Sequence, residues 1–246
     1  MAVSFRAVGA YVNGTGNLTP VIPAGTVAGD LMLCVHGMKP FSATTTMNNS
    51  WVSIGFATDG TVAAGNDTGS MKAQIFYKVH TGTESNPTIA NTATNVNGAV
   101  IISFQNATGF WDFVGSGGGD GTTGTGYSIT TAASLAVQSG DFLIGNIALR
   151  SDASTIGAIT ITGTGLTIGS FTKSPATDLL TTAGGDMRMS VGYSQVTAGT
   201  ATTTLTLAST LGGSQTGSSF IARIREATEP VGGYYDPFGM MGLFGV

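Results

Sequence analysis

The sequence predicts an all-β fold, built as two tandem, related β-sandwich halves followed by an extended C-terminal tail. The first observation is the composition: 38 of 246 residues are glycine and only 9% are charged, whereas an ordinary soluble domain has about 25% charged residues. The second is that long stretches are interrupted by glycine or filled with threonine and valine, which favour strands over helices. The third is an internal repeat. Together they indicate many short strands joined by Gly-rich turns.

The repeat is centred on a Gly-Asp turn and the apolar run behind it, which span residues 29–33 and return as residues 140–144. Glycine accepts a positive φ and aspartate can bond nearby backbone amides, so the pair marks a turn. Three further segments recur in the same order: residues 53–56 as 167–171, residues 69–77 as 185–193, and residues 107–108 as 227–228.

The spacing between matched segments grows from 111 through 114 and 116 to 120 residues. Such slow growth suits one duplicated unit whose second copy gained a few loop residues. We therefore predict a first β-sandwich repeat over residues 1–112 and a second over residues 113–228.

Strands of the first copy are predicted from hydrophobic periodicity. Leu31, Leu33 and Val35 alternate with a second, equally apolar set that includes Cys34, so this strand should be central and covered on both faces. The other strands are expected over residues 2–12, 51–56, 71–79 and 99–104. In the second copy, residues 187–194 repeat the alternation of residues 71–79, and residues 220–224 close the copy as residues 99–104 close the first.

Both copies place methionine and tyrosine inward on the strand that follows the loop, and a cation at the same outward position. The cations are Lys72 and Arg188. Between the copies, the aromatic group Phe110, Trp111 and Phe113 is expected to pack against a sandwich edge. The glycine run at residues 115–121 is expected to form a flexible loop.

The C-terminal tail, residues 229–246, differs from the repeats because it combines glycine with large apolar side chains. Glycines 239, 242 and 245 oppose an isolated helix, and an exposed apolar run is unfavourable in water. The tail can fold back on its own sandwich, dock into a neighbouring subunit, or form a disordered end. Docking into a neighbour is favoured, and the expected docking residues are Tyr234, Tyr235, Phe238, Met240, Met241, Leu243 and Phe244.

No residue set predicts catalysis or cofactor binding. Cys34 and His36 are two apart on one strand, about 6–7 Å, beyond the hydrogen-bond reach that a nucleophile and its base need. His80 and Glu84 are replaced in the second copy by Val196 and Thr200, so the repeat does not require them. The G-x-G-x-x-G match at residues 119–124 lacks the strand and helix that phosphate binding needs.

Metal ligands are not predicted either. Two histidines and one cysteine nearly exclude a structural zinc site. The pairs Asp59 with Asp67, and Asp112 with Asp120, fit no calcium-loop spacing, although a bound calcium stays open. Sugar recognition uses exposed aromatic rings beside polar groups, and the candidate glycan contacts are Trp51, Trp111 and Tyr127.

Charge and hydropathy limit the classes of partner that the chain is expected to bind. A net charge of −4 gives no electrostatic footprint for nucleic acid. No segment approaches 18 continuous apolar residues, so no membrane insertion is expected. A single cysteine allows no intrachain disulfide, and the N-terminus shows no signal-peptide pattern. A surface so poor in charge is expected to be covered by partner subunits, which predicts a homo-oligomer.

The order of the motifs resembles a group of β-sandwich proteins of bacteriophage tails and virions, also found among bacterial surface proteins. The resemblance covers roughly residues 20–228 and excludes the tail from Pro230 onward. It implies a jelly-roll-like fold, a non-enzymatic structural or adhesive role, and no catalytic residues. The motifs, in order, are residues 22–25, residues 27–33, Trp51, residues 76–79 with Gly82 and Glu84, residues 98–104 with Asn106, and the return of Gly-Asp at Gly140.

The sequence thus predicts a non-enzymatic structural component of a bacteriophage virion, assembled in the bacterial host cytoplasm. Its expected place is the tail apparatus, a fibre or an adaptor, and its expected partners are other virion subunits. The alternatives are a capsid decoration protein and a carbohydrate-binding or adhesin module that contacts a host surface glycan. A hydrolase is a third alternative, with no residue set to support it.

Overall fold

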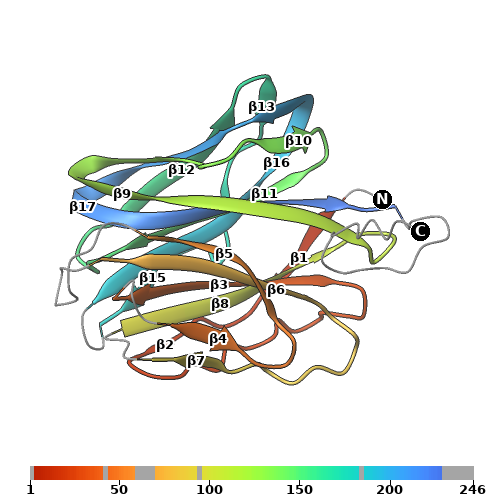
Figure 1. Cartoon of the computed structure of the whole chain (residues 1–246), viewed down its shortest axis with the longest axis horizontal. Coiled ribbons are helices and arrows are strands. Elements are labelled where there is room, and N and C mark those ends of the chain that lie inside the picture. Colours follow the sequence, from red (N-terminus) through yellow and green to blue (C-terminus); the bar gives the residue numbers. More distant parts are fainter. Residues whose placement is uncertain (1–2, 41–43, 59–69, 93–95, 183–185, 229–246) are drawn as a thin grey trace, which may run out of the picture.

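The protein is described by a computed structural model over residues 3–40, 44–58, 70–92, 96–182 and 186–228. Every regular element in these ranges is a β-strand, so the predicted all-β class is confirmed. Nothing in the described ranges has the length and apolarity of a membrane-spanning helix. The strands form two large antiparallel sheets and one small sheet (Figure 1). The C-terminal docking residues lie outside the described ranges.

The first sheet contains the strands predicted for the first copy, with β3 at its centre. β3 pairs with β8 on one side and β6 on the other, and all of its residues are buried, as its apolar character on both faces predicts. The strand order is β1 (Ser4–Val8), β8 (Val96–Gln105), β3 (Leu31–Lys39), β6 (Lys72–Val79) and β5 (Val52–Thr58), with β2 (Val12–Gly14) also on β8. The small sheet pairs β4 (Thr45–Met47) with β7 (Ile89–Asn91).

The second sheet is larger because three of its strands are long. Its order is β10 (Leu135–Gln138), β16 (Met187–Thr203), β11 (Phe142–Leu149), β17 (Leu205–Glu226) and β12 (Ile156–Gly163). The remaining strands pair at its margins, namely β9 (Trp111–Thr130) along β17, and β13 (Leu166–Ile168), β14 (Thr172–Lys173) and β15 (Leu179–Thr181) along β16.

The centres of the two sheets share one strand order and one register. The order β8-β3-β6 in the first sheet corresponds to β17-β11-β16 in the second. The register is also the same, with spacings of 111, 116 and 120 residues between matched positions: Leu31 lies opposite Val79 and Phe104, and Phe142 lies opposite Gln195 and Ile224. This correspondence supports the predicted duplication.

The two Gly-Asp turns also have the same hydrogen bonds. The Asp30 carboxylate accepts the Val27 N–H at 2.8 Å, and the Asp141 carboxylate accepts the Gln138 N–H at 2.8 Å. The preceding glycine has a φ of 91° in the first turn and 94° in the second, a conformation that favours glycine. The recurrence of the pair therefore follows from turn geometry.

One of the sequence matches is wrong. Residues 53–56 lie in β5, where Gly55 pairs with Ile75 of β6. The glycine proposed to match Gly55 is Gly169, whose N–H donates to the carbonyl of Gln195. Gln195 corresponds by register to Val79 and not to Ile75. Beside β16, the place of β5 is taken by β14 and β15. A short Ile-Gly match carries little information in a chain this rich in glycine.

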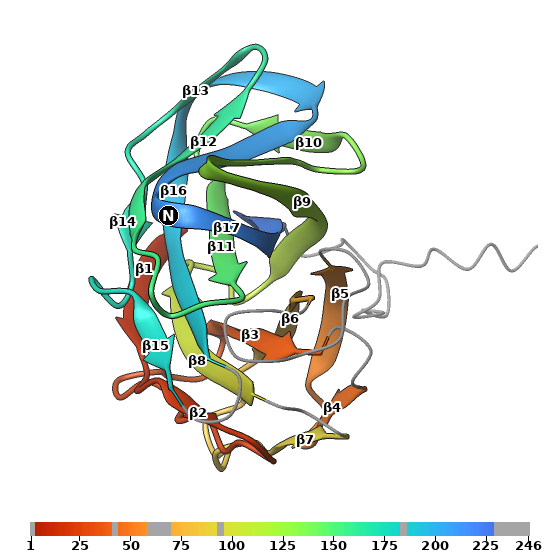
Figure 2. The ribbon, with the colours of Figure 1, turned by 90° about the vertical axis from the view of Figure 1, so that its left-hand side faces the viewer.

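The largest core lies between the two sheets, which stack face to face (Figure 2). It draws on residues of both predicted repeats, so the two sheets form one body, and the boundary at residues 112 and 113 stays a prediction. Two aromatic contacts across this core are reciprocal. Phe5 stacks on Tyr193 at 4.9 Å between ring centroids, and Phe113 packs on Tyr77 at 3.9 Å.

The outer faces of both sheets are covered as well. Leu18, Trp51 and Ile89 belong to the core on the outer side of the first sheet, and a further core around β12 and the outer parts of β9, β16 and β17 covers the second. Lys72 and Arg188 lie on the side of their strands opposite the shared core, as predicted. Because the outer faces are covered too, each side chain is only 8% exposed.

The glycine run at residues 115–121 is a strand, which corrects the expectation of a loop. It lies in β9 and pairs with β17. A Cβ on Gly115 would lie 2.2 Å from the Phe220 ring, and one on Gly117 would lie 2.7 Å from the Ala57 Cβ. These glycines therefore allow β9 to approach β5 and the Phe220 ring.

Candidate functional site

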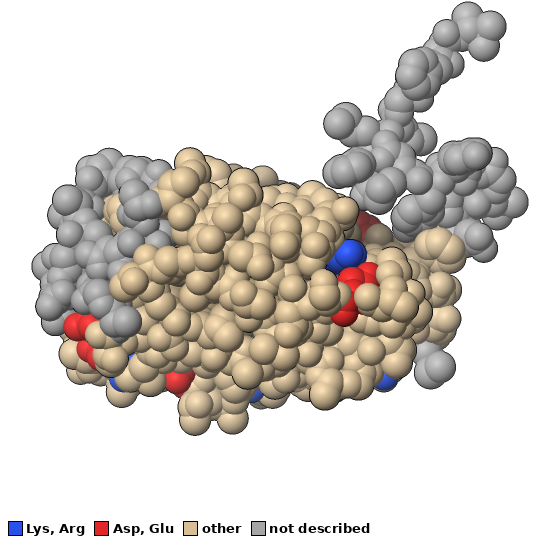
Figure 3. Space-filling model, turned by 90° about the horizontal axis from the view of Figure 1, so that it is seen from below, with Lys and Arg blue, Asp and Glu red and all other residues tan. Residues whose placement is uncertain are grey.

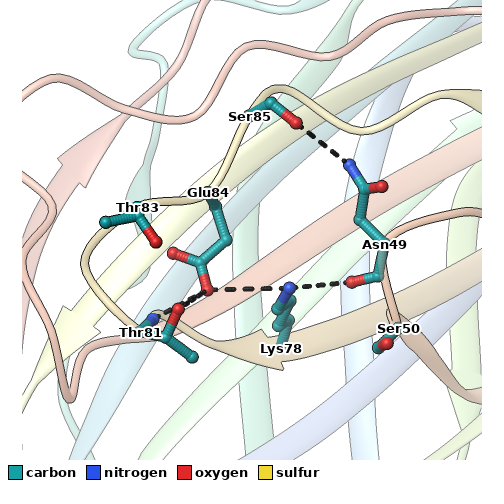
Figure 4. A pocket seen from close by; sticks show the side chains of 7 residues that line it. All are labelled: Asn49, Ser50, Lys78, Thr81, Thr83, Glu84 and Ser85. Atoms are coloured by element: carbon teal, nitrogen blue, oxygen red, sulfur yellow. Dashed lines mark hydrogen bonds and ion pairs between the residues drawn. The ribbon is translucent and has the colours of Figure 1, made fainter.

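A polar pocket lies where β6 ends, between the turn that precedes β5 and the loop that follows β6. Its volume is about 330 Å³. Lys78 lies near the end of β6, and the two loops provide the rest of the wall (Figure 4). The lining residues are Asn49, Ser50, Lys78, Thr81, Thr83, Glu84 and Ser85.

The turn on one side of the pocket has an unusual backbone. Asn49 and Ser50 are consecutive residues with φ values of 57° and 61°, a left-handed conformation that asparagine tolerates better than serine. Asn48 fixes the turn, because its side-chain oxygen accepts the Thr88 N–H at 2.7 Å. Trp51 anchors the other end in the core, where it is 6% exposed. Strain held by its surroundings is common at binding sites.

Glu84 is the acidic group of the pocket, and its side chain is 4% exposed. One carboxylate oxygen accepts the backbone N–H and the hydroxyl of Thr81, both at 2.7 Å. The other lies 3.1 Å from His80 Nε2. Burial raises the pKa of Glu84, but these hydrogen bonds and the nearby His80 outweigh burial and lower the pKa to about 2. Glu84 is therefore ionised at neutral pH.

His80 is oriented by the loop that it begins. Its Nδ1 accepts the Gly82 N–H at 3.0 Å. In the neutral ring the proton then lies on Nε2, which faces Glu84. His80 is therefore a close polar neighbour of the carboxylate, 3.1 Å from Oε2, but it makes no well-aligned hydrogen bond to that oxygen.

Lys78 joins the two walls of the pocket. Its ammonium donates to the Asn49 carbonyl at 2.8 Å and lies 3.6 Å from Glu84 Oε1. Asn49 closes the ring, because its Nδ2 donates to the Ser85 hydroxyl at 3.4 Å. Figure 4 shows this chain of contacts from Ser85 to Thr81 around the pocket. With one ammonium and one carboxylate, the lining is electrically balanced.

The corresponding position in the second sheet lacks the charged residues of this pocket. By register, Lys78 corresponds to Ser194, and His80 corresponds to Val196, whose N–H bonds the Asp141 carbonyl as the His80 N–H bonds the Asp30 carbonyl. There the chain continues in β16 to Thr203 without a loop. The charged groups of the pocket are therefore not a requirement of the shared sheet.

The aromatic residues expected to contact glycans are buried. Trp111 is 7% exposed and donates from Nε1 to the Gly29 carbonyl at 2.8 Å. Tyr127 is 1% exposed, and its hydroxyl shares a 2.8 Å hydrogen bond with Ser219. Trp51 is 6% exposed and belongs to the core on the outer side of the first sheet. The expectation that these rings are exposed is wrong, and a sugar cannot stack on them.

The thiol and imidazole of β3 are closed to solvent as well. Burial raises the pKa of the Cys34 thiol far above its ordinary value. Burial also lowers the pKa of His36 to about 4, a shift that the hydrogen bond to Asn97 opposes and the nearby Lys72 reinforces. Both side chains are 0% exposed. Neither group can reach a substrate in this conformation.

Of the two aspartate pairs considered for calcium, one is hydrogen-bonded within the protein and the other lies outside the described residues. Asp112 binds Arg223 through both carboxylate oxygens at 2.6 and 3.2 Å. Asp120 accepts the N–H groups of Thr122 and Ser128. Asp59 and Asp67 lie outside the described ranges. Within those ranges, no three histidine, cysteine or acidic side chains gather as metal ligands.

Comparison with protein-family models, curated proteins and solved structures gives no match for this chain.

A second groove, of about 460 Å³, lies between β12 and residues 168–173. Its walls are formed largely by isoleucine, threonine and Phe171. Its charged lining residue, Lys173, already binds Asp178 at 2.7 Å and the Ile156 carbonyl at 2.8 Å. This groove therefore offers fewer free polar groups than the pocket at Glu84.

Sequence reasoning considered His80 and Glu84 but missed the pocket, because its other members are scattered Ser, Thr and Asn residues in a chain full of them. The signal was the difference between the copies. A charged set present in one copy and replaced in the other is not needed for the strands, so a separate role becomes a reasonable hypothesis.

Proposed function

We propose that this chain is a non-enzymatic structural subunit of a bacteriophage particle, in the tail apparatus, a fibre or an adaptor. The proposal is supported by the order of the sequence motifs, by a two-sheet body with a shared core, and by the burial of Cys34 and His36. The main supporting observation is that the lysine and arginine side chains are paired within the fold.

All nine lysine and arginine side chains have a partner within the fold. Most are held by carboxylates or backbone carbonyls, and one lies over an aromatic ring. The pairs are Arg6 with Asp30, Lys39 with the Arg150 carbonyl, Lys72 with Phe56, Lys78 with Asn49 and Glu84, Arg150 with Gln215, Lys173 and Arg188 with Asp178, Arg223 with Asp112, and Arg225 with Asp141.

The result is a surface with few free charges. Figure 3 shows one broad face on which acidic and basic side chains are sparse among neutral ones. Burying a charge in an interface carries a large desolvation penalty, and interface cores are accordingly depleted of charged residues. A surface of threonine, serine, glycine and asparagine can be covered by other subunits at much smaller penalty, which favours a building block of an assembly.

The same surface would suit a capsid decoration protein, so the test must locate the chain as well as detect it. Particles are purified by density gradient from the bacterial culture that carries the gene and analysed by mass spectrometry. Antibody–gold labelling in the electron microscope then distinguishes tail from head. We expect several copies per particle at the tail. Recovery of the chain only in the soluble fraction outside particles would overturn the proposal.

A further inference from the structure

We propose that the pocket at Asn49, Lys78 and Glu84 binds one neutral saccharide unit. This inference goes beyond the particle assignment and does not depend on it. It also replaces the aromatic residues as the place where a glycan would be contacted. The proposal is supported by the shape of the pocket, its charge balance, its free hydrogen-bonding groups, and the lack of its charged residues at the corresponding place in the second sheet.

The pocket is formed before any ligand arrives. Its two walls are tied together by the hydrogen bonds from Lys78 to the Asn49 carbonyl at 2.8 Å and from Asn49 to Ser85 at 3.4 Å. Glu84 is fixed by Thr81 and faced by His80. Groups that are already ordered lose little conformational entropy on binding. A volume of about 330 Å³ accommodates a single sugar ring rather than an extended chain.

The charge balance of the pocket selects a neutral ligand. An anion would be attracted by Lys78 but would lie beside Glu84, whose carboxylate is ionised because its pKa is lowered to about 2. A cation would be attracted by Glu84 but would lie beside the Lys78 ammonium, 3.6 Å from that carboxylate. Like charges at such distances oppose binding in both cases. A ligand without net charge avoids both conflicts.

The free groups of the lining match hydroxyls. Ser50 and Thr83 are exposed hydroxyl residues on opposite walls, and Ser85 accepts one hydrogen bond and still has a donor. Glu84 Oε1 already accepts two hydrogen bonds from Thr81 and Oε2 is buried, so the carboxylate positions Thr81 and the Lys78 ammonium, and Lys78 adds a donor. Sugar hydroxyls both donate and accept, so one ring can bond to the ammonium and to several hydroxyl groups at once. The hydrogen bond to the ammonium is the strongest of these and would fix the orientation of the ring.

The corresponding place in the second sheet provides an internal comparison. Ser194 stands where Lys78 stands, and Val196 where His80 stands. β16 nevertheless forms the same ladder with β11. The charged residues of the pocket are therefore unnecessary for the sheet, and the saccharide site should exist once per chain.

The test uses the full chain and saturation-transfer NMR with free glucose, galactose, mannose and N-acetylglucosamine. Sialic acid, inorganic phosphate and calcium chloride are the charged probes, and a glycan array distinguishes a terminal sugar from an internal one. We expect one or more neutral sugars to bind with a millimolar Kd and a stoichiometry of one. None of the charged probes should compete for the site.

Two variants and a matched control locate the binding. Glu84→Gln removes the charge at nearly constant size, and Thr83→Val removes an exposed hydroxyl that the fold does not use. Each should weaken binding by about tenfold or more, Thr83→Val because a hydrogen bond to the ligand is removed and Glu84→Gln because the charge that holds Lys78 in place is removed. Asp178→Asn disrupts a comparable ion pair on the second sheet, at 2.7 Å from Lys173, and should leave binding unchanged.

Three results would overturn the proposal. They are the absence of binding by every neutral sugar of the panel and array, stronger binding of a charged probe at this site, and binding that survives both Glu84→Gln and Thr83→Val. Circular dichroism of each variant establishes that it is folded. Particle analysis is independent of all these measurements, so failure here and failure of the structural role are distinguishable.

Discussion

At the scale of single residues, His36 connects the stability of the first sheet to pH. The imidazole is fully buried and contacts Asn97, with Nε2 and Oδ1 separated by 3.3 Å. Burial, reinforced by Lys72, lowers its pKa from 6.5 to about 4 in the folded chain. The unfolded chain therefore takes up a proton at higher pH than the folded chain does. The stabilisation is present above pH 6.5 and is lost as the pH falls through 4.

We predict that the free energy of unfolding falls by about 3 kcal/mol between pH 6.5 and pH 4 because of this group. Urea unfolding followed by tryptophan fluorescence at several pH values measures the change. The variant His36→Gln cannot titrate, so its stability should depend less steeply on pH in this window. Glu84 contributes little at the upper end of this range, because it is ionised there in the unfolded chain, where its pKa is near 4.5, and in the folded chain, where its pKa is lowered to about 2. Parallel curves for both proteins would contradict the prediction.

The Gly-Asp turns give a second prediction at this scale. Asp141 is 1% exposed and binds Arg225 through two oxygens, each at 2.7 Å, while it also accepts the Gln138 N–H. Asp141→Ala removes the two short hydrogen bonds of the guanidinium, which keeps only longer contacts to Asp112 and the Ala136 carbonyl, and it leaves the turn without its acceptor. We expect a loss of about 3 kcal/mol in the free energy of unfolding.

The matched control is Asp152→Ala, which removes a carboxylate from a partly exposed loop of the same sheet. Its effect should stay within about 0.5 kcal/mol, as is usual for surface changes. Thermal unfolding measured by calorimetry compares the two. Equal effects would mean that the Asp141 contacts are not what stabilises the turn.

At the scale of elements, β9 shows how glycine can be required inside a strand. A Cβ on Gly117 would lie 2.5 Å from the Ser219 carbonyl oxygen and 2.7 Å from the Ala57 Cβ. Neither atom belongs to the end of a flexible side chain. Gly126 lies in the same strand, but a Cβ there meets nothing within 4 Å.

We therefore predict that Gly117→Ala destabilises the fold by about 2 kcal/mol, since overpacking forces β9 away from its neighbours. Gly126→Ala should be neutral or slightly stabilising, because it only restricts the unfolded chain. Chemical denaturation measures both in parallel. Similar values for the two variants would show that strand propensity, rather than close approach, determines the role of these glycines.

Sequence reasoning worked where the information was local. The apolar alternation of residues 31–36 predicted a central strand, and the Gly-Asp turn predicted its start. The spacings between matched segments also agree with the strand register, because β11 pairs with β16 and β17 at the positions that correspond to the pairs of β3 with β6 and β8. The glycine run in β9 failed because its partners, Ala57 and Phe220, lie far away in the sequence.

The prediction of the binding residues failed for a related reason. Composition identified aromatic side chains as binding residues, but burial decides whether a ring can meet a ligand, and packing that decides burial is long-range. Trp111 is buried in the shared core, and its indole N–H donates to the Gly29 carbonyl, 82 residues away in the sequence. The pocket arises where two loops lie side by side at the end of β6, and no local pattern of Ser, Thr and Asn shows that they meet.

At the scale of the whole molecule, the two sheets form a single body with a shared core. Gly37 is a point of close approach, where a Cβ would lie 3.4 Å from the Ala148 Cβ of the facing sheet. These two residues occupy corresponding register positions in β3 and β11. Together with the reciprocal pairs of Phe5 with Tyr193 and Phe113 with Tyr77, this arrangement has the reciprocity of an isologous contact, in which each surface meets its counterpart.

The proposed assembly gives the last prediction. Deletion of residues 230–246 removes the tail's apolar side chains, which we expect to anchor the chain in a neighbour. Native mass spectrometry should show a smaller oligomer, and particles should incorporate less of the shortened chain. The body should keep its melting temperature, because its cores lie in residues 3–228. Unchanged incorporation together with an unchanged oligomer would exclude an anchoring tail.

The burial of Cys34 has a practical consequence. The chain contains one thiol, and it lies in the middle of the central strand, where a labelling reagent can reach it only after the strand separates from its cover. The rate of its alkylation under native conditions would thus report how often that sheet opens. No engineered probe is needed, and the same measurement inside an assembled particle would show how far the neighbours restrain the motion.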